Sequence, residues 1–234
     1  MRKLITAALF VGTFGLLAPQ GRAQAPATPA PLPKGPRAQA ASRPLAGWIL
    51  VVDPGHGRNP VGGRDTGAIG VNGVSEDQNV LAIARDLAPL LRSEGADVVL
   101  TRGVYDPGPP PVQGLIRRVA LAEKVHADLF LSIHQNDGAP RDHGVETFYD
   151  TPASRAFAED IQKAMVAVTG LADLGVHRQA FYVLRNTTMP SALVEGGFLS
   201  NPKEAAEISS PAFHALEAKA LNEAILLYAE HVRP

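Results

Sequence analysis

Polar side chains that bind metals or transfer protons follow three short apolar runs of the kind that form buried strands. They lie in the segments Asp53-Pro54-Gly55-His56, His134-Gln135-Asn136 and Glu195-Gly196-Gly197. A fourth candidate, Glu76, follows a long Gly-rich segment and opens a stretch with helical periodicity. In parallel sheets, functional groups gather at the carboxyl ends of the strands, so we expect these side chains to share one edge.

Two imidazoles and one carboxylate are a usual ligand set for catalytic zinc, with water in the fourth position. The same set also binds iron, so the ligand types do not select the metal. The separations are twenty residues from His56 to Glu76 and fifty-eight from Glu76 to His134, which match no short zinc motif. Structural explanations also exist, since loop histidines are commonly surface residues and the helix dipole favours an acid in a first turn. The residue types leave both interpretations open.

Glu195 is harder to explain as a structural residue. It ends the apolar run 192–194 and precedes two glycines, where backbone can approach a ligand closely. Asp53 and Asn136 have two possible roles: they orient the imidazoles of the metal ligands, or they stabilise local turns.

Short apolar runs alternate with helical periodicity along the chain. The pattern predicts strands at 48–53, 97–101, 129–134, 144–149, 180–184 and 192–195, and helices at 75–94, 113–126, 152–168 and 211–231. We expect residues 169–179 to form a connection. The alternation predicts a single α/β domain with a twisted, mostly parallel sheet of about six strands and helices on both faces.

The N-terminal residues have the layout of a secretory signal peptide over residues 1–25. A basic start precedes an apolar run from Leu4 to Ala18 and small residues at Ala23 and Ala25. This run is shorter than the roughly 20 residues of a membrane-spanning helix. Residues 26–44 are rich in Pro and Ala and predict an extended tether, which leaves 45–234 as the catalytic domain. We expect a periplasmic or secreted protein with no stable membrane anchor after signal cleavage.

Composition excludes one class of partner. Six of the 22 lysines and arginines precede Leu45, so the domain has 16 of them against all 23 acidic residues, a formal charge of about −7. So acidic a domain is a poor candidate for nucleic-acid binding, which depends on clustered Lys and Arg. The chain has no cysteine, which excludes disulfides and a lipid attached through Cys.

Several linked motifs resemble those of the zinc-dependent N-acetylmuramoyl-L-alanine amidases that remodel bacterial cell walls. The resemblance spans residues 48–230 and keeps the order of the motifs. They are Val51-Val52-Asp53-Pro54-Gly55-His56-Gly57, Gly67-Ala68-Ile69-Gly70 with Ser75-Glu76, Leu131-Ser132-Ile133-His134-Gln135-Asn136, Gly175-Val176-His177-Arg178, Val183-Leu184-Arg185 and residues 189–201.

The resemblance implies roles for four residues. His56, Glu76 and His134 would be ligands of Zn²⁺, and Glu195 would be the catalytic carboxylate. His177 stands where Lys or Arg is common in the family, a difference that concerns only a substrate contact.

The implied reaction is hydrolysis of the amide bond between the lactyl group of N-acetylmuramic acid and L-alanine in peptidoglycan. Two alternatives are an inactive wall-binding regulator and a zinc peptidase that cuts the stem peptide. A pure binder has no need of all four site residues, which argues against the first. We expect a monomer with peptidoglycan as its partner, and no division or envelope partner can be identified from the sequence.

Overall fold

The computed structural model describes residues 43–58, 64–103 and 114–232. The expected signal peptide, and the expected tether apart from Arg43 and Pro44, lie outside these residues. Within them, no helix has the length and apolarity that crossing a membrane requires.

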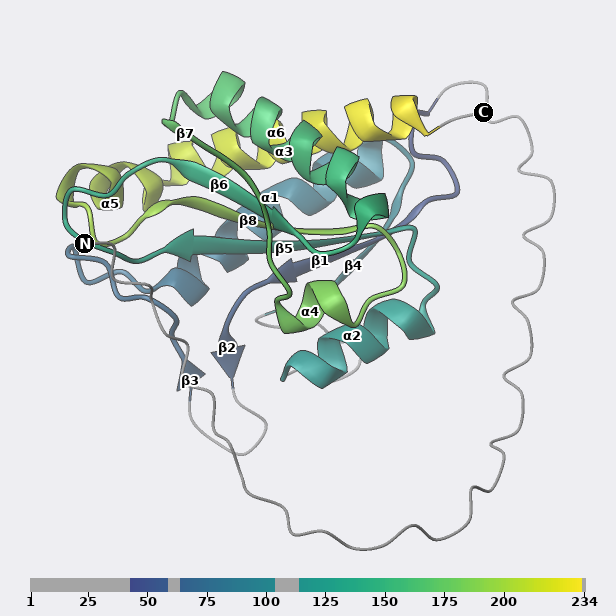
Figure 1. Ribbon diagram of the computed structural model, residues 1–234, viewed down its shortest axis with the longest axis horizontal. Helices are drawn as coiled ribbons and strands as arrows, with labels where there is room; N and C mark the ends of the chain where they lie inside the picture. Colours follow the sequence, from purple (N-terminus) through teal and green to yellow (C-terminus); the bar gives the residue numbers. More distant parts are fainter. Residues whose placement is uncertain (1–42, 59–63, 104–113, 233–234) are drawn as a thin grey trace, which may run out of the picture. The chain divides into compact units, whose positions relative to one another are not determined.

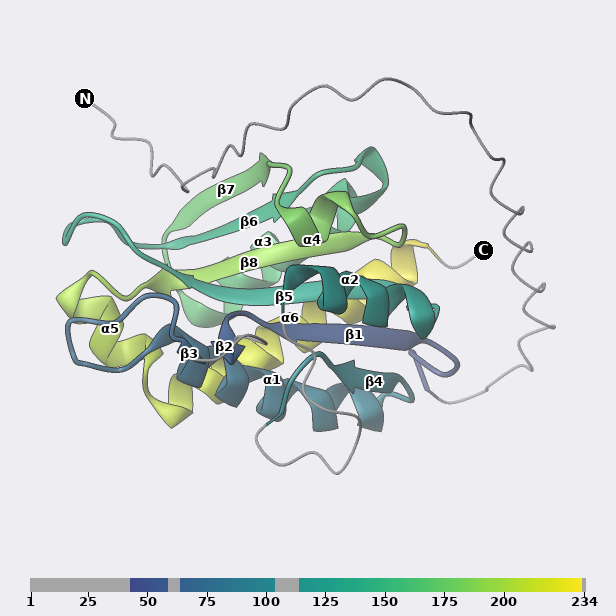
Figure 2. The same cartoon turned by 90° about the horizontal axis from the view of Figure 1, so that it is seen from below.

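A six-stranded sheet forms the centre of the fold. Its strands are β1 (Ile49–Pro54), β4 (Asp97–Leu100), β5 (Leu129–Asn136), β6 (Val145–Tyr149), β7 (Asp173–Arg178) and β8 (Ser191–Phe198). They lie in the order β4-β1-β5-β8-β6-β7, which Figure 2 shows from below. Every neighbouring pair is parallel except β6 and β8, which are antiparallel.

Helices cover both faces of this sheet. The helices α1 (Glu76–Ser93), α3 (Arg155–Thr169) and α6 (Pro211–His231) lie on one face, and α2 (Leu115–Lys124) and α4 (Tyr182–Arg185) on the other (Figure 1). With both faces covered, β1, β5 and β8 are almost continuously buried, which explains their unbroken apolar sequences. The expected α/β fold is therefore confirmed.

The larger apolar core lies under α1, α3 and α6. It includes Leu131 and Val194 from the sheet and Ile83, Ile161 and Leu221 from the three helices, all at most 2% exposed. A smaller core lies on the opposite face, where the short helices α2 and α4 contact only part of the sheet. The two faces therefore differ in how completely they are covered.

One strand was placed wrongly from the sequence. Residues 180–184 were expected to be a strand, but α4 occupies Tyr182–Arg185, and the strand is β7, inside the expected connection. β7 is an edge strand whose side chains are exposed or half-buried, so it lacks the apolar pattern of a buried strand. Val183 and Leu184 of the single-turn helix α4 are buried in the smaller core. Their tertiary packing overrides the preference of these residues for strands.

Three short elements complete the described part of the fold, besides a 3₁₀ turn at Pro152–Ser154. β2 (Gly57–Arg58) and β3 (Arg64–Asp65) pair within the Gly-rich segment. Helix α5 (Pro202–Ile208) begins after Asn201, whose side chain accepts hydrogen bonds from the backbone N–H of Lys203 and Glu204. This is a standard N-cap.

A carboxyl group is enclosed beneath the sheet. Glu217 on α6 is fully buried, and neither of its oxygens has a hydrogen-bond partner among the residues that the structure describes. A Cβ added at Gly196 of β8 would lie 2.5 Å from this carboxyl, so the glycine makes room for it. Burial raises the pKa of Glu217 to about 8, because water no longer solvates its charged form.

We predict that Glu217 makes folding stability fall as pH rises. Between the ordinary pKa of 4.5 and about 8, the folded protein keeps a proton that the unfolded chain has lost, so each pH unit costs up to about 1.4 kcal/mol. Glu217→Gln should remove this slope. In urea unfolding, the free energy of unfolding of the variant should therefore rise relative to that of the parent from pH 5 to pH 8. The exposed Glu230→Gln on the same helix is the control. A constant difference between parent and Glu217→Gln would refute the assignment.

Candidate metal and active site

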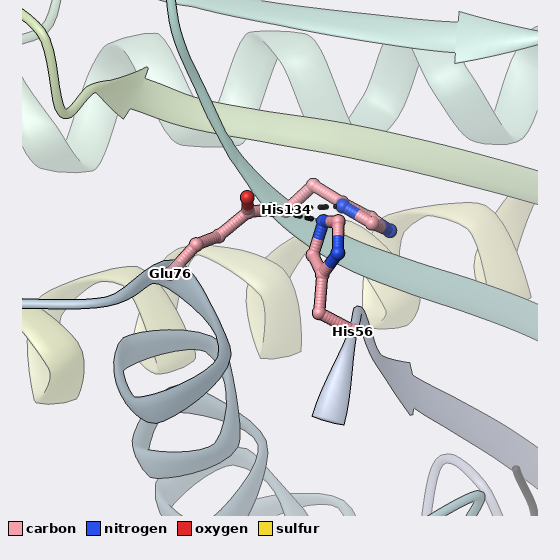
Figure 3. A group of neighbouring side chains, drawn as sticks. All are labelled: His56, Glu76 and His134. Carbon is pink, nitrogen blue, oxygen red and sulfur yellow. Dashed lines mark hydrogen bonds and ion pairs between the residues drawn. The ribbon is translucent and has the colours of Figure 1, made fainter. Parts of the chain in front are cut away.

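Three potential metal ligands converge near the carboxyl ends of the inner strands β1 and β5. Figure 3 shows Glu76, at the start of α1, with its carboxylate directed toward the imidazoles of both His56 and His134. Its Oε1 lies 3.1 Å from His56 Nε2 and 2.8 Å from His134 Nδ1. One ligand atom from each residue lies within 4.8 Å of the other two. In the described part of the chain, this is the one group of at least three His, Cys, Asp or Glu side chains close enough to hold a metal ion.

The donor atoms fit a tetrahedral metal ion. Metal–ligand distances of about 2.0–2.2 Å place neighbouring donors about 3.3–3.6 Å apart in a tetrahedron. The two distances from Glu76 to the imidazoles, 2.8 and 3.1 Å, therefore need to widen slightly, and all three donors lie within 4.8 Å of one another before a metal draws them together. Three protein ligands also leave a fourth position for water or substrate.

The backbone brings these ligands together from three separate elements. His56 follows β1 in a left-handed conformation, with φ of 58°. Glu76 is anchored from both sides, since its carboxylate accepts hydrogen bonds from the N–H of Ala68 (2.9 Å) and Gln135 (3.1 Å). His134 packs against Gly55, where any Cβ would overlap its imidazole. His134 and Glu195 lie within β5 and β8, which extend farther than the sequence pattern indicated.

Charges in this group favour an anionic Glu76. Burial disfavours its charged form, but hydrogen bonds and charges from His134 and His56 outweigh burial and hold the pKa of Glu76 well below its ordinary value. Burial likewise opposes the charge on His56, yet Glu76 and Asp65 raise the pKa of this imidazole overall. The carboxylate of Asp65 lies 3.0 Å from His56 Nδ1, the nitrogen that does not face Glu76.

Glu195 shares a pocket with two of these ligands. It pairs with His134 across β5 and β8, and its enclosed Oε2 has no hydrogen-bond partner in the part of the chain that the structure describes. Burial, with the charges of Glu76, Glu146 and Glu217, raises the pKa of Glu195 well above its ordinary value. A bound divalent cation would oppose this shift, because an opposite charge favours the carboxylate.

The pocket has a volume of about 530 Å³ and lies between α2, α4 and the sheet. His56, His134 and Glu195 line it together with further polar side chains, which are Asp53, Asp65, Arg118 and Ser132. Apolar and aromatic side chains from α2, from α4 and the residue before it, and from β8 complete the lining; they are Leu115, Phe181, Tyr182, Val183 and Leu193. Most ligand pockets combine such an apolar lining with a few polar groups.

On the β6 side of Glu195 lie the polar side chains of Glu146, Asn136 and His177, which form a polar edge. Glu146 of β6 stands opposite Glu195 in the antiparallel pair. Its carboxylate accepts a hydrogen bond from Asn136 (2.6 Å) and lies 3.4 Å from His177 Nε2. His177 thus forms an ion pair with an acid when it is protonated.

From the sequence, Asp53 and Asn136 had two possible roles, orienting the imidazoles or stabilising local turns, and the hydrogen bonds of both side chains go to groups other than the imidazoles. Asp53 binds Thr101, Ser132 and Arg118, and Asn136 binds Glu146. The residue beside the ligand His56 is Asp65, which was not singled out. Its position within a Gly-rich segment shortly after His56 was the one available signal.

The architecture is an α/β fold with a candidate metal site at the carboxyl ends of its central strands, and comparison with known proteins identifies the family. The model of the N-acetylmuramoyl-L-alanine amidase family matches residues 50–226, so the chain belongs to this family. The resemblance seen in the motifs is confirmed.

Individual relatives agree with the family match. The chain is 36% identical over 190 residues to the amidase LytC of Bacillus subtilis, covering 79% of this chain and 36% of LytC. It is 32% identical over 230 residues to the amidase AmiA of Escherichia coli, covering 77% and 75%. The catalytic domain of the amidase CwlV from Bacillus (Paenibacillus) polymyxa superposes with a TM-score of 0.70 at 35% identity, covering 78% and 98%. The chain thus spans about a third of LytC and nearly all of the CwlV domain.

We predict that Gly67→Ala disrupts the metal site. A Cβ at this position would lie 2.6 Å from His56 Cδ2 and closer still to the Glu76 carboxylate, so both ligands must move. Gly73→Ala is a matched control, since Gly73 also has a positive φ, 79° against 61°, but has nothing within 4 Å. Metal affinity, measured by competition with a chelating dye, should fall at least about tenfold for Gly67→Ala alone. Equal losses in both variants would attribute the effect to backbone strain.

Proposed function

We propose that this domain hydrolyses the amide bond between the lactyl group of N-acetylmuramic acid and L-alanine in peptidoglycan, with zinc held by His56, Glu76 and His134. The observation that carries the proposal is the convergence of these three donors in an amidase-family fold, with His56 and His134 lining the same pocket as Glu195. The ligand types suit zinc, which commonly binds two imidazoles and a carboxylate.

Glu195 is the proposed general base and acid. Zinc, when bound, is a Lewis acid that lowers the pKa of water towards about 7 and polarises an amide carbonyl. The enclosed Oε2 of Glu195 accepts no hydrogen bond from residues 43–58, 64–103 or 114–232 and is therefore available to accept a proton from the attacking water. Its tendency to hold a proton, which burial strengthens, suits the second step, in which Glu195 delivers that proton to the departing amine.

The pocket supports a defined placement of substrate. The apolar lining between α2 and α4 suits the uncharged parts of a glycopeptide, and aromatic side chains such as Tyr182 offer a face to a sugar ring. The polar edge at Glu146 and His177 suits amide and charged groups of the substrate.

The substrate also bears on location. Peptidoglycan lies outside the cytoplasmic membrane, so the proposed activity requires export. The signal-like residues 1–25 support this, and we propose a periplasmic or secreted enzyme.

Digestion of purified peptidoglycan tests the function. Mass spectrometry of the products should show intact peptides with a free N-terminal L-alanine and glycan strands with free lactyl carboxylates. Cuts inside the stem peptide would identify a peptidase, and binding without new termini would identify an inactive regulator. Either result would refute the amidase proposal.

We predict that His56→Ala and His134→Ala abolish stoichiometric zinc binding, because each removes an imidazole that no neighbouring group replaces. His231→Ala, at the far end of α6, is the control. Zinc content after dialysis, measured by plasma mass spectrometry, should be near one per chain for the parent and control only. Full zinc content in both site variants would mean that the metal binds elsewhere.

We predict that Glu195→Gln keeps zinc and fold but loses about 10²–10⁴ in rate, because the amide is nearly isosteric and cannot accept a proton. Glu146→Gln, one strand away, is the comparison and should retain far more activity. If Glu146→Gln shows the large loss while Glu195→Gln stays within a few-fold of the parent, Glu146 is the base.

A further inference from the structure

Two buried arginines surround the backbone that carries His56. Arg102 follows β4 and Arg118 lies on α2, and they are only 7% and 4% exposed. Both guanidinium groups point into the turn between β1 and β2 and donate hydrogen bonds to backbone oxygens there.

Together they bind three consecutive carbonyls. Pro54 O accepts from both Arg102 Nε and Arg118 Nη1, each at 2.9 Å. Gly55 O accepts from Arg102 Nη2 at 2.7 Å, and His56 O accepts from Arg118 Nη2 at 2.5 Å. These contacts surround a residue whose φ of 58° is unfavourable for any side chain larger than glycine. Such a conformation persists only where its surroundings determine it.

Each arginine also connects this turn to another ligand. Arg102 Nη2 also donates to the carbonyl of Asp77, the residue after Glu76, at 2.8 Å. One guanidinium therefore binds backbone carbonyls next to both His56 and Glu76. Arg118 forms an ion pair with Asp53, which in turn accepts a hydrogen bond from Ser132, two residues before His134.

Charge is compatible with this arrangement. Burial and the neighbouring Arg118 lower the pKa of Arg102 to about 10, which leaves it charged at neutral pH. The planar fork of each guanidinium serves several acceptors at once, which a lysine ammonium on a flexible chain does not reproduce.

We propose that Arg102 and Arg118 are positioning residues that hold the His56 backbone in its left-handed conformation and so set the spacing of the metal ligands. The inference rests on the proposed metal site and goes beyond it, since neither guanidinium touches the donor atoms. Its consequence is that both residues contribute to metal affinity through backbone geometry.

The test compares Arg118→Lys and Arg102→Lys with Arg92→Lys. Arg92 also donates to a backbone carbonyl, that of Val98 (3.0 Å), but lies in the last turn of α1, remote from the site. Zinc affinity and release rate are measured on the full chain by competition with a chelating dye, and stability is measured separately by urea unfolding in a chelator.

We expect zinc affinity to fall about 10–100-fold in Arg118→Lys and Arg102→Lys, with faster release, while Arg92→Lys matches the parent. The unfolding midpoint of the metal-free protein should change much less than this loss implies. Affinity within twofold of the parent in both variants would overturn the inference, as would a loss fully accounted for by reduced metal-free stability. If one variant does not fold, the other decides, because only Arg102 binds Gly55 O and only Arg118 binds His56 O. A parent protein that binds no zinc would instead refute the proposed function.

Discussion

The carboxylate of Asp53 is buried inside the fold, and its charge has to be compensated where it lies. An unpaired charge in a low-dielectric interior is too costly to retain. Arg118 compensates it, and Thr101 and Ser132 add hydrogen bonds, which keeps the pKa of Asp53 below its ordinary value despite burial. These partners come from α2, β5 and the segment after β4, so one buried charge fixes how these elements meet β1. The ligands His56 and His134 are placed with β1 and β5.

The site concentrates acidic groups whose ionised forms the protein alone compensates incompletely. Glu76 is stabilised as an anion by two imidazoles, whereas the enclosed oxygen of Glu195 has no hydrogen-bond partner among the described residues. Glu146 and Glu217 lie close enough to raise the pKa of Glu195 further. A divalent cation among the three donors would relieve this repulsion. The local cost fits the general pattern that proteins depart from ideal packing and pairing at functional sites.

One face of the sheet contributes most of the apolar core, and the other face forms the pocket of the candidate site. Long helices α1, α3 and α6 cover one face and bury the larger core there. The other face has only α2 and the single-turn α4, and the space beside them becomes the pocket that reaches His134 and Glu195. A helical layer that covered the whole of this face would fill that pocket. The partial cover is therefore what leaves a pocket beside Glu195, the proposed catalytic carboxylate.

The sequence by itself determined the elements whose apolar pattern is strong, and with them the fold. Buried parallel strands read as unbroken apolar runs, and amphipathic helices show their period, so β1, β5, β8 and the long helices were predicted correctly. The linked motifs also singled out His56, Glu76, His134 and Glu195 before any geometry was known. Only the tertiary structure decided that β7 is a strand and α4 a helix, because an edge strand and a one-turn helix take their stability from neighbours and not from their own pattern. It also decided that Asp65, not Asp53 or Asn136, lies beside His56, and that two distant arginines hold its backbone. Such contacts join residues up to 65 positions apart, and local periodicity contains no information about them.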